Sequence, residues 1–384
     1  MPIKLPPLSL YIHIPWCVRK CPYCDFNSHT HSGALPVDAY VRCLLEDLDT
    51  ELQWVQGRKL KSVFFGGGTP SLMPAEAIGA VLNGVRERLE LEDNAEITLE
   101  TNPGTAEYSN FDTLLSSGVN RLSFGAQSFN DSHLQTLGRI HSGSEIIQAV
   151  ARAKSAGFTN FNIDLMHSLP EQNLPQALED IKQAIELEPA HISWYQLTIE
   201  PNTVFHHTQP VLPDDDTQSD IFEEGVKLLE TSGYTQYEIS AYAKTGFQSA
   251  HNLNYWRFGD YLAIGAGAHG KVTIPEQGGY IRYQKTRMPN DYLDHSKPFR
   301  SKQHLVEEHE RPLEFFMNVL SMKQGVYIAD FENYTGLSVN QLEPSIQLLR
   351  EQGLLVNDIG RLAPSPKGLL FLNDILEGLA NEKC

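Results

Sequence analysis

The chain has 384 residues, of which 41% are hydrophobic and 20% are charged. This composition is typical of a soluble globular protein and excludes a disordered or fibrous chain. The chain has 30 Lys and Arg and 48 Asp and Glu, which gives a net charge of −18. Because such an acidic surface repels phosphate groups, nucleic acid is not an expected partner. We find neither a signal-peptide pattern nor an apolar run long enough to span a membrane, and we expect a cytoplasmic protein.

Six β-rich runs recur in the first half of the chain and alternate with amphipathic helical stretches. The expected strands are Leu8–Ile14, Ser62–Phe65, Ile97–Glu100, Arg121–Gly125, Asn160–Met166 and His191–Leu197. Helices are expected at Val37–Trp54, Ala75–Leu89, Ser144–Ala156 and Leu174–Leu187. Repeated β–α units indicate a parallel sheet covered by helices, because parallel neighbours need crossover connections. Six units fall short of the eight of a closed barrel, so we predict an α/β fold with a partial, splayed (β/α)6 barrel.

Unusual residues gather where the predicted strands end. Cys17 follows the first strand, and the glycine-rich run 66–69 follows the second. Asn102, Gln127 and His167 follow the next three. Since sites of such folds lie at the carboxyl ends of the strands, these residues predict one shared site.

The rest of the chain predicts two further units. Residues 206–302 read as a less regular extension, with a helix near Thr217–Ser232 and a glycine-rich segment at Gly265–Gly270. After residue 303 the expected elements are the helices Leu305–Met322, Asp330–Tyr334 and Gln341–Gln352, a hairpin at Leu354–Leu362 and a helix at Gly368–Leu379. We therefore expect domains at 1–205, 206–302 and 303–384, the last a small winged-helix-like module. Its presumptive recognition helix carries Glu343 and Glu351 against Arg350 alone, which favours a packing or lid role over DNA reading.

Three of the five cysteines lie within eight residues, at Cys17, Cys21 and Cys24. A Cys-x3-Cys-x2-Cys loop can hold three irons of a [4Fe–4S] cluster and leave the fourth iron open. The alternatives are a zinc site completed by His29 and a chance coincidence, and zinc knuckles usually sit in smaller modules. Cys43 lies in a helical run and is expected to be a small buried group.

Several longer motifs accompany the cysteines, and together they resemble the radical S-adenosylmethionine (SAM) superfamily. They read YIHIPWC (11–17), GGGTPS (66–71), ETNPG (100–104), GAQSF (125–129), LGRIH (137–141) and DLMHSLP (164–170). The branch they resemble contains the oxygen-independent coproporphyrinogen III oxidases and the radical SAM heme chaperones of the HemW type. The resemblance implies a [4Fe–4S] cluster on the three cysteines and bound SAM. The residues it implies for SAM contact are Tyr11, Tyr23, Gly67, Gly68, Thr69, Glu100, Gln127, Arg139 and Asp164.

Three features separate the two relatives within this branch. The oxidase pattern continues with a fourth cysteine where this chain has Phe26, and its N-terminal extension is not expected here because the first strand begins near residue 8. Residues 251–256 read HNLNYW, and the resemblance implies heme binding by His251, Asn252 and Tyr255 in the chaperones. We therefore expect a heme chaperone, with an oxidase of porphyrin biosynthesis as the alternative. Whether the chain is an enzyme stays open, and no catalytic residue is assigned.

The same segment suggests other porphyrin contacts and partners. Trp256 and Tyr242 are candidates to cover a porphyrin face, and the candidates to pair with propionates are Arg257, Lys271, Arg282, Lys285 and Arg287. The resemblance implies heme, apo-hemoproteins such as respiratory cytochromes, and an electron donor of the flavodoxin or ferredoxin type as partners. Peripheral contact with a membrane and a homodimer are further expectations.

Overall fold

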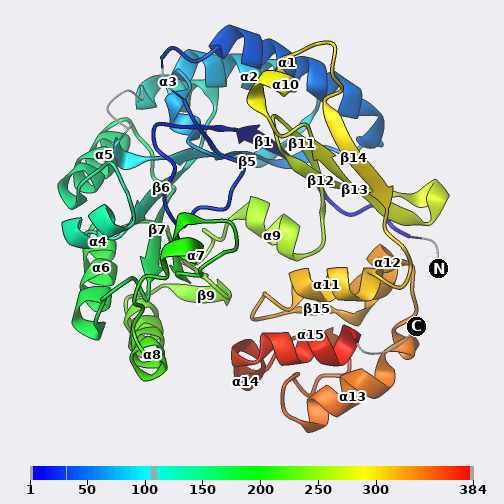
Figure 1. The fold of residues 1–384 in the computed structure, drawn as a ribbon. Coiled ribbons are helices and arrows are strands. Elements are labelled where there is room, and N and C mark those ends of the chain that lie inside the picture. Colours follow the sequence, from blue (N-terminus) through cyan, green and yellow to red (C-terminus); the bar gives the residue numbers. More distant parts are fainter. Residues whose placement is uncertain (1–2, 32, 105–109, 381–384) are drawn as a thin grey trace.

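The computed structural model describes residues 3–31, 33–104 and 110–380, and its centre is a run of parallel strands (Figure 1). These are β1 (Leu8–Ile14), β4 (Leu60–Gly67), β5 (Leu91–Thr101), β6 (Arg121–Gln127), β7 (Phe161–His167) and β8 (His191–Gln196). They are hydrogen-bonded in that order, each parallel to the next. The predicted fold class is confirmed.

Helices cover the outer face of this curved sheet (Figure 1). They are α1 (Val37–Glu51), α2 (Ala75–Arg88), α3 (Phe111–Ser117), α4 (Asp131–Thr136), α5 (Gly143–Ser155), α6 (Leu174–Glu186) and α8 (Asp215–Thr231). Capping boxes start α5, with Ser142 and Glu145, and α6, with Asn173 and Gln176. These reciprocal bonds satisfy backbone N–H groups that a helix start leaves unpaired, which explains why both starts were predictable. The short α3 and α4 carry too few turns to show a clear period and were not predicted.

Residues 206–302 are more regular than expected, because they extend the same sheet at both edges. On the β8 side lie β10 (Ala241–Ala243) and then β9 (Thr235–Glu238). On the β1 side lie β11 (Asp260–Ile264), β12 (His269–Ile274), β13 (Gly279–Lys285) and β14 (Arg300–Leu305). The pairing of β11 with β1 is parallel and joins residues about 250 positions apart, a pairing that local periodicity cannot reveal.

The C-terminal residues, together with Ile3, Phe258 and Tyr280, form a second hydrophobic core. The C-terminal elements lie beneath the concave side of the sheet (Figure 1). Its elements are α11 (Arg311–Val319), β15 (Val326–Tyr327), α12 (Ile328–Thr335), α13 (Glu343–Glu351), β16 (Arg361–Leu362), α14 (Pro366–Leu370) and α15 (Leu372–Ala380). The chain turns back on itself near the expected hairpin at Leu354–Leu362: Leu355 forms an antiparallel bridge with Pro364, and the N–H of Val356 donates to the carbonyl of Ala363 at 3.0 Å. The strand β16 itself pairs with β15, which the sequence did not predict. The domain boundaries stay predictions.

One short helix, α9 (Ala250–Trp256), lies on the concave side, between the sheet and the C-terminal elements (Figure 1). The side chain of Glu96 on β5 accepts hydrogen bonds from the N–H groups of Ala250 and His251, at 3.0 Å each. A carboxylate at a helix N-terminus satisfies unpaired donors and complements the helix dipole. These hydrogen bonds hold the N-terminus of α9 against β5.

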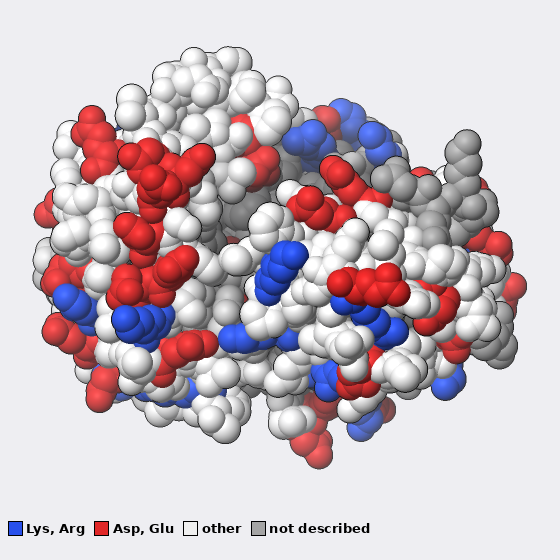
Figure 2. Space-filling model, turned by 90° about the horizontal axis from the view of Figure 1, so that it is seen from below, with Lys and Arg blue, Asp and Glu red and all other residues white. Residues whose placement is uncertain are grey.

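The surface agrees with the acidic composition. Asp and Glu gather on the left of the face seen in Figure 2, the side on which α6 and α8 lie in Figure 1. Helix α8 alone carries Asp215, Asp216, Asp220, Glu223, Glu224 and Glu230. Among the described helices, none is long and apolar enough to cross a membrane.

Candidate functional site

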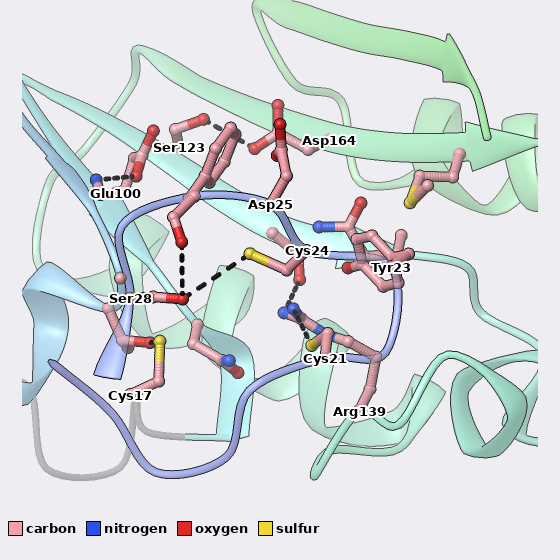
Figure 3. Close-up of a pocket in the computed structure, with 18 of the residues that line it drawn as sticks. Cys17, Cys21, Tyr23, Cys24, Asp25, Ser28, Glu100, Ser123, Arg139 and Asp164 are labelled. Atoms are coloured by element: carbon pink, nitrogen blue, oxygen red, sulfur yellow. Dashed lines mark hydrogen bonds between the residues drawn. The ribbon is translucent and has the colours of Figure 1, made fainter. Parts of the chain in front are cut away.

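The three clustered cysteines lie on one loop that leaves the carboxyl end of β1 (Figure 3). A two-residue strand pair, β2 (Trp16–Cys17) and β3 (His29–Thr30), closes this loop at its base. Each sulfur has a polar neighbour: Thr69 Oγ1 donates to Cys17 Sγ at 3.4 Å, and Arg139 Nη1 donates to Cys21 Sγ at 3.6 Å. Ser28 Oγ lies 3.8 Å from Cys24 Sγ. Hydrogen bonds to the sulfurs are one means by which proteins tune an iron–sulfur cluster.

The spacing of the sulfur atoms does not suit zinc. Tetrahedral zinc with Zn–S bonds of about 2.3 Å holds its thiolates only about 3.8 Å apart. Within the described ranges, these three sulfurs do not all lie within 4.8 Å of one another, and His29 completes no such group with them. The His29 ring instead contacts Asn27 Oδ1 at 3.3 Å.

The cysteines line a cavity of about 420 Å³ together with most of the residues predicted to contact SAM. Those that line it are Tyr23, Gly67, Gly68, Thr69, Glu100, Gln127, Arg139 and Asp164. Tyr11 does not line it. Its side chain lines a neighbouring cavity instead, and its hydroxyl lies 3.0 Å from His13 Nδ1. Tyr11 nevertheless lies near Glu100 of the first cavity, whose charge adds to the effect of burial in raising the Tyr11 pKa, and its SAM contact stays a prediction.

Two glycines after β4 bring backbone close to this cavity. Gly67 has a φ of 114°, and a Cβ placed there would meet the His13 ring at 2.5 Å. A Cβ at Gly68 would meet the carbonyl oxygen of Trp16 at 2.6 Å. Only glycine fits either position, and the exposed backbone of such a turn suits a ligand that must approach closely.

Two buried carboxyl groups face the cavity from neighbouring parts of the sheet, Glu100 on β5 and Asp164 on β7 (Figure 3). Burial raises the pKa of Glu100 to about 8, the charge of Asp164 adds to that shift, and the N–H of Gly67 at 3.1 Å opposes it. Burial also raises the pKa of Asp164, although Asn162 and Ser123 donate to it at 2.8 and 2.9 Å. A cationic ligand between these groups would relieve the cost of ionising them.

Arg139 supplies positive charge on the opposite side of the cavity. Its Nη2 donates to the carbonyl of Gly125 at 2.6 Å, while its buried Nε has no hydrogen-bond partner among the described residues. Gln127, at the end of β6, has a φ of 74°, and Tyr195 donates to its Oε1 at 2.8 Å. An unpaired guanidinium donor across the cavity from two carboxyls suits a ligand that carries both a carboxylate and a cation, as SAM does.

Sequence reasoning missed several lining residues, among them Ser28, Ser123, Tyr195 and Glu200. Tyr195 stands near the carboxyl end of β8, so the strand-end rule that found Gln127 would have found it as well. Ser123 lies within a strand, and nothing in the local pattern marks it.

A second cavity, of about 790 Å³, lies between α9 and the cysteine loop. His251, Asn252, Tyr255 and Trp256 line it from α9, so the predicted heme residues share one helix and one cavity. The two cavities have a common wall made of Asp25, Phe26, Gly67 and Glu100. A ligand in one cavity would therefore lie next to a ligand in the other.

His251 sits in this second cavity as a neutral imidazole. Burial lowers the pKa of His251 to about 4, and its ring stacks on Phe64 with centroids 4.8 Å apart. Ser62 Oγ lies 2.9 Å from Nδ1. A neutral imidazole with one nitrogen held by the protein is the usual form of a histidine that ligates a metal.

The structure sorts the other porphyrin contacts that the sequence suggested. Trp256 lines the cavity. The prediction that Tyr242 covers a porphyrin face is wrong, because Tyr242 is fully buried on β10 against Trp194. Of the propionate candidates, Lys271 is paired with Asp260, Arg282 with Glu314 and Lys285 with Asp47, and Arg257 does not line the cavity. Only one of the five candidates lines the cavity, Arg287.

Comparison with known proteins agrees with this geometry. The model of the Radical SAM superfamily matches residues 11–185, and that of the HemN C-terminal domain matches residues 306–371. The heme chaperone HemW of Haemophilus influenzae is 53% identical over 99% of this chain and 100% of its own length. HemW of Escherichia coli is 52% identical over 98% of both chains. The solved structure of coproporphyrinogen III oxidase (HemN) from E. coli covers 98% of this chain and 91% of its own with a TM-score of 0.81, and at 23% identity it shows a shared fold.

Proposed function

Since this chain belongs to the HemW family within the radical SAM superfamily, we propose that it is a heme chaperone: it binds heme and transfers it to apo-hemoproteins. The observation that carries the proposal is the position of His251, a neutral imidazole on the wall of a cavity next to the cysteine loop. A volume of about 790 Å³ lies within the range of small-molecule and cofactor sites. Imidazole is a common axial ligand of heme iron.

The first cavity fits the cofactors of the superfamily. Cys17, Cys21 and Cys24 would hold a [4Fe–4S] cluster, and Arg139, Glu100 and Asp164 would bind the carboxylate and the cationic groups of SAM. The bound cluster and SAM supply one-electron chemistry. The residues around them would orient SAM, and Gly67 and Gly68 would give it room to approach the backbone.

In the second cavity, His251 would bind the heme iron, and Tyr255 and Trp256 would cover the porphyrin. Their rings lie 5.0 Å apart, and the ring of Tyr255 lies 5.5 Å from that of Tyr261. Tyr255 is 37% exposed, so this wall faces solvent. An open wall suits a cargo that must leave again.

The oxidase alternative is less well supported by these residues. Phe26 stands where the oxidase pattern has a fourth cysteine, and its side chain is 63% exposed on the wall that both cavities share. A large apolar side chain at this place extends a porphyrin-binding surface and offers no ligand for iron.

An electron donor of the flavodoxin or ferredoxin type would dock beside the cysteine loop. Val18 and Ile140 are 48% and 40% exposed there, in a shallow hollow that also includes Arg19 and Cys21. Apolar side chains next to a cation suit the acidic surface of such a small redox protein. The cytoplasmic location, contact with a membrane and a homodimer stay predictions.

The test is an anaerobic heme titration of the iron–sulfur-reconstituted protein, followed by the Soret absorbance. We expect stoichiometric binding that weakens about tenfold or more in His251→Ala and stays unchanged in the matched control His309→Ala, an exposed loop histidine. Transfer is then measured by mixing the loaded protein with an apocytochrome. Binding indifferent to His251, or heme that never reaches the acceptor, would contradict the proposal.

The cluster has its own test. Replacing Cys17, Cys21 or Cys24 with serine should abolish the reconstituted cluster, measured as bound iron and sulfide, whereas Cys43→Ser should retain it. Cys43 is buried on α1 and lines neither cavity. Heme titration of the cluster-free variants shows whether an occupied cluster site affects the neighbouring heme site.

A further inference from the structure

The floor of the second cavity is a row of side chains from neighbouring strands. Tyr11 on β1 pairs with Phe64 on β4, and β11 joins β1 to the antiparallel strands β12 and β13. His269 on β12 stands opposite Gln284 on β13. Phe64, Tyr11, His269 and Gln284 all line the cavity, so the floor runs from β4 to β13. At about 4.8 Å between strands, such a floor is wide enough for a porphyrin standing on its edge.

Two walls rise from this floor, α9 on one side and the segment 25–27 of the cysteine loop on the other. Asn27 fixes the second wall: its carbonyl oxygen contacts His13 Nε2 at 2.9 Å, and its Nδ2 donates to the carbonyls of Ala266 and Arg287, also at 2.9 Å. The backbone of Arg287 is thereby tied to the cysteine loop. Its side chain stands at the rim, next to the end of the floor that β12 and β13 form.

Charge is distributed unevenly around the cavity. Asp25 and Glu100 lie on the side of the cysteine loop and β5, whereas Arg287 lies at the β13 side. Arg287 makes no ion pair with any described residue, and its charge lowers the pKa of the neighbouring His269, in addition to the larger effect of burial. Among the described residues that line this cavity, Arg287 is the only lysine or arginine.

We propose that Arg287 binds a propionate of the heme cargo and so sets the orientation of the porphyrin, an inference that rests on the proposed function. Heme carries its two carboxylates on one edge. The carboxyl group of Asp25 repels that edge, and the guanidinium of Arg287 attracts it, so the propionates lie toward β12 and β13. His251 then meets the iron from α9. The site selects a porphyrin with carboxylates on one edge over an uncharged porphyrin of the same size.

The experiment compares heme with heme dimethyl ester, in which both carboxylates are blocked, on the reconstituted full chain. The variants are Arg287→Ala and the matched control Arg257→Ala, an exposed arginine that does not line the cavity. We expect Arg287→Ala to weaken heme binding about tenfold and to leave ester binding unchanged, because a charge-assisted hydrogen bond is lost only with the free acid. The wild type should bind the ester about tenfold more weakly than heme.

Two results would overturn the inference. Equal heme affinity in Arg287→Ala and the wild type would show that the guanidinium does not bind the cargo. An equal loss for heme and for the ester would show that Arg287 acts through the shape of the cavity and not through its charge. Failure of the proposed function has a different signature, since the wild type would then bind no heme or would bind it independently of His251.

Discussion

The hydroxyl of Ser62 on β4 lies 2.9 Å from Nδ1 of His251 on α9, two groups 189 residues apart in the chain. Ser62 has one hydroxyl proton, and it donates that proton to Ser9 Oγ at 2.8 Å. The contact with His251 therefore uses the proton on Nδ1, and Nε2 keeps its lone pair. A histidine held in this tautomer is prepared to ligate iron through Nε2.

Replacing Ser62 with alanine should weaken heme binding about tenfold, because the imidazole then loses the acceptor that fixes its tautomer and orientation. Heme titration of the reconstituted protein measures the effect. Ser155→Ala is the matched control, since Ser155 bonds only within the exposed helix α5. Heme affinity in Ser62→Ala equal to that of the control would mean that Ser62 does not prepare His251.

Glu100 should make the stability of the cluster-free protein depend on pH. Its pKa is about 8 in the folded state against an ordinary value of 4.5, so the folded state binds the proton more tightly. The protonated Glu100 therefore contributes its full stabilisation of the folded state below pH 4.5, and this contribution is lost as the pH rises through about 8. Glu100→Gln removes this dependence, and its free energy of unfolding should exceed that of the wild type by ~3.5 kcal/mol more at pH 8 than at pH 5.

Urea unfolding at pH 5, 6.5 and 8 gives this difference directly. Glu76→Gln on the exposed side of α2 is the control and should show the same pH dependence as the wild type. A difference between Glu100→Gln and the wild type that stays constant with pH would show that Glu100 titrates normally in the fold.

Gly67→Ala should abolish SAM binding and destabilise the protein. The added Cβ would lie 2.5 Å from the His13 ring, at a φ of 114°. Gly57→Ala is a close control, because Gly57 also has a positive φ, 74°, but nothing lies within 4 Å of a Cβ there. Gly57→Ala should lower the free energy of unfolding by about 1 kcal/mol through backbone strain. Gly67→Ala should lower it further, because the added Cβ also collides with the His13 ring.

Equilibrium dialysis of SAM and urea unfolding measure the two glycine effects separately. Equal stability of the two variants together with unchanged SAM binding would refute the crowding at Gly67.

Lys285 should be essential to the stability of the added strands. Its ammonium is fully buried and pairs with Asp47 and Glu51 on α1, the latter at 2.6 Å. Lys285→Met leaves these carboxylates short of a partner inside the protein and should cost about 3–5 kcal/mol of unfolding free energy in urea. Lys302→Met, on exposed β14, should change it by less than about 0.5 kcal/mol. A loss as small as that of the control would show that the buried pairs contribute no net stability.

The sequence by itself determined the central barrel and the first cavity. Strands and helices there follow one another along the chain, and each capped helix and buried strand carries its own local signal. The strand-end rule then placed Cys17, Gly67 and Gln127 at one site, because parallel strands bring their carboxyl ends together. The motif resemblance to a family of heme chaperones is confirmed by relatives 53% and 52% identical to this chain.

Only the tertiary structure decided which residues form the second cavity. It placed Tyr11 and His269 on the cavity floor, left Tyr242 and four of the five basic candidates out of the lining, and brought Ser62 against His251 from β4. These outcomes depend on β11 pairing with β1 and on α9 resting on Glu96. Such contacts join residues more than 150 positions apart, and their energy comes from packing and hydrogen bonds that no local sequence pattern encodes.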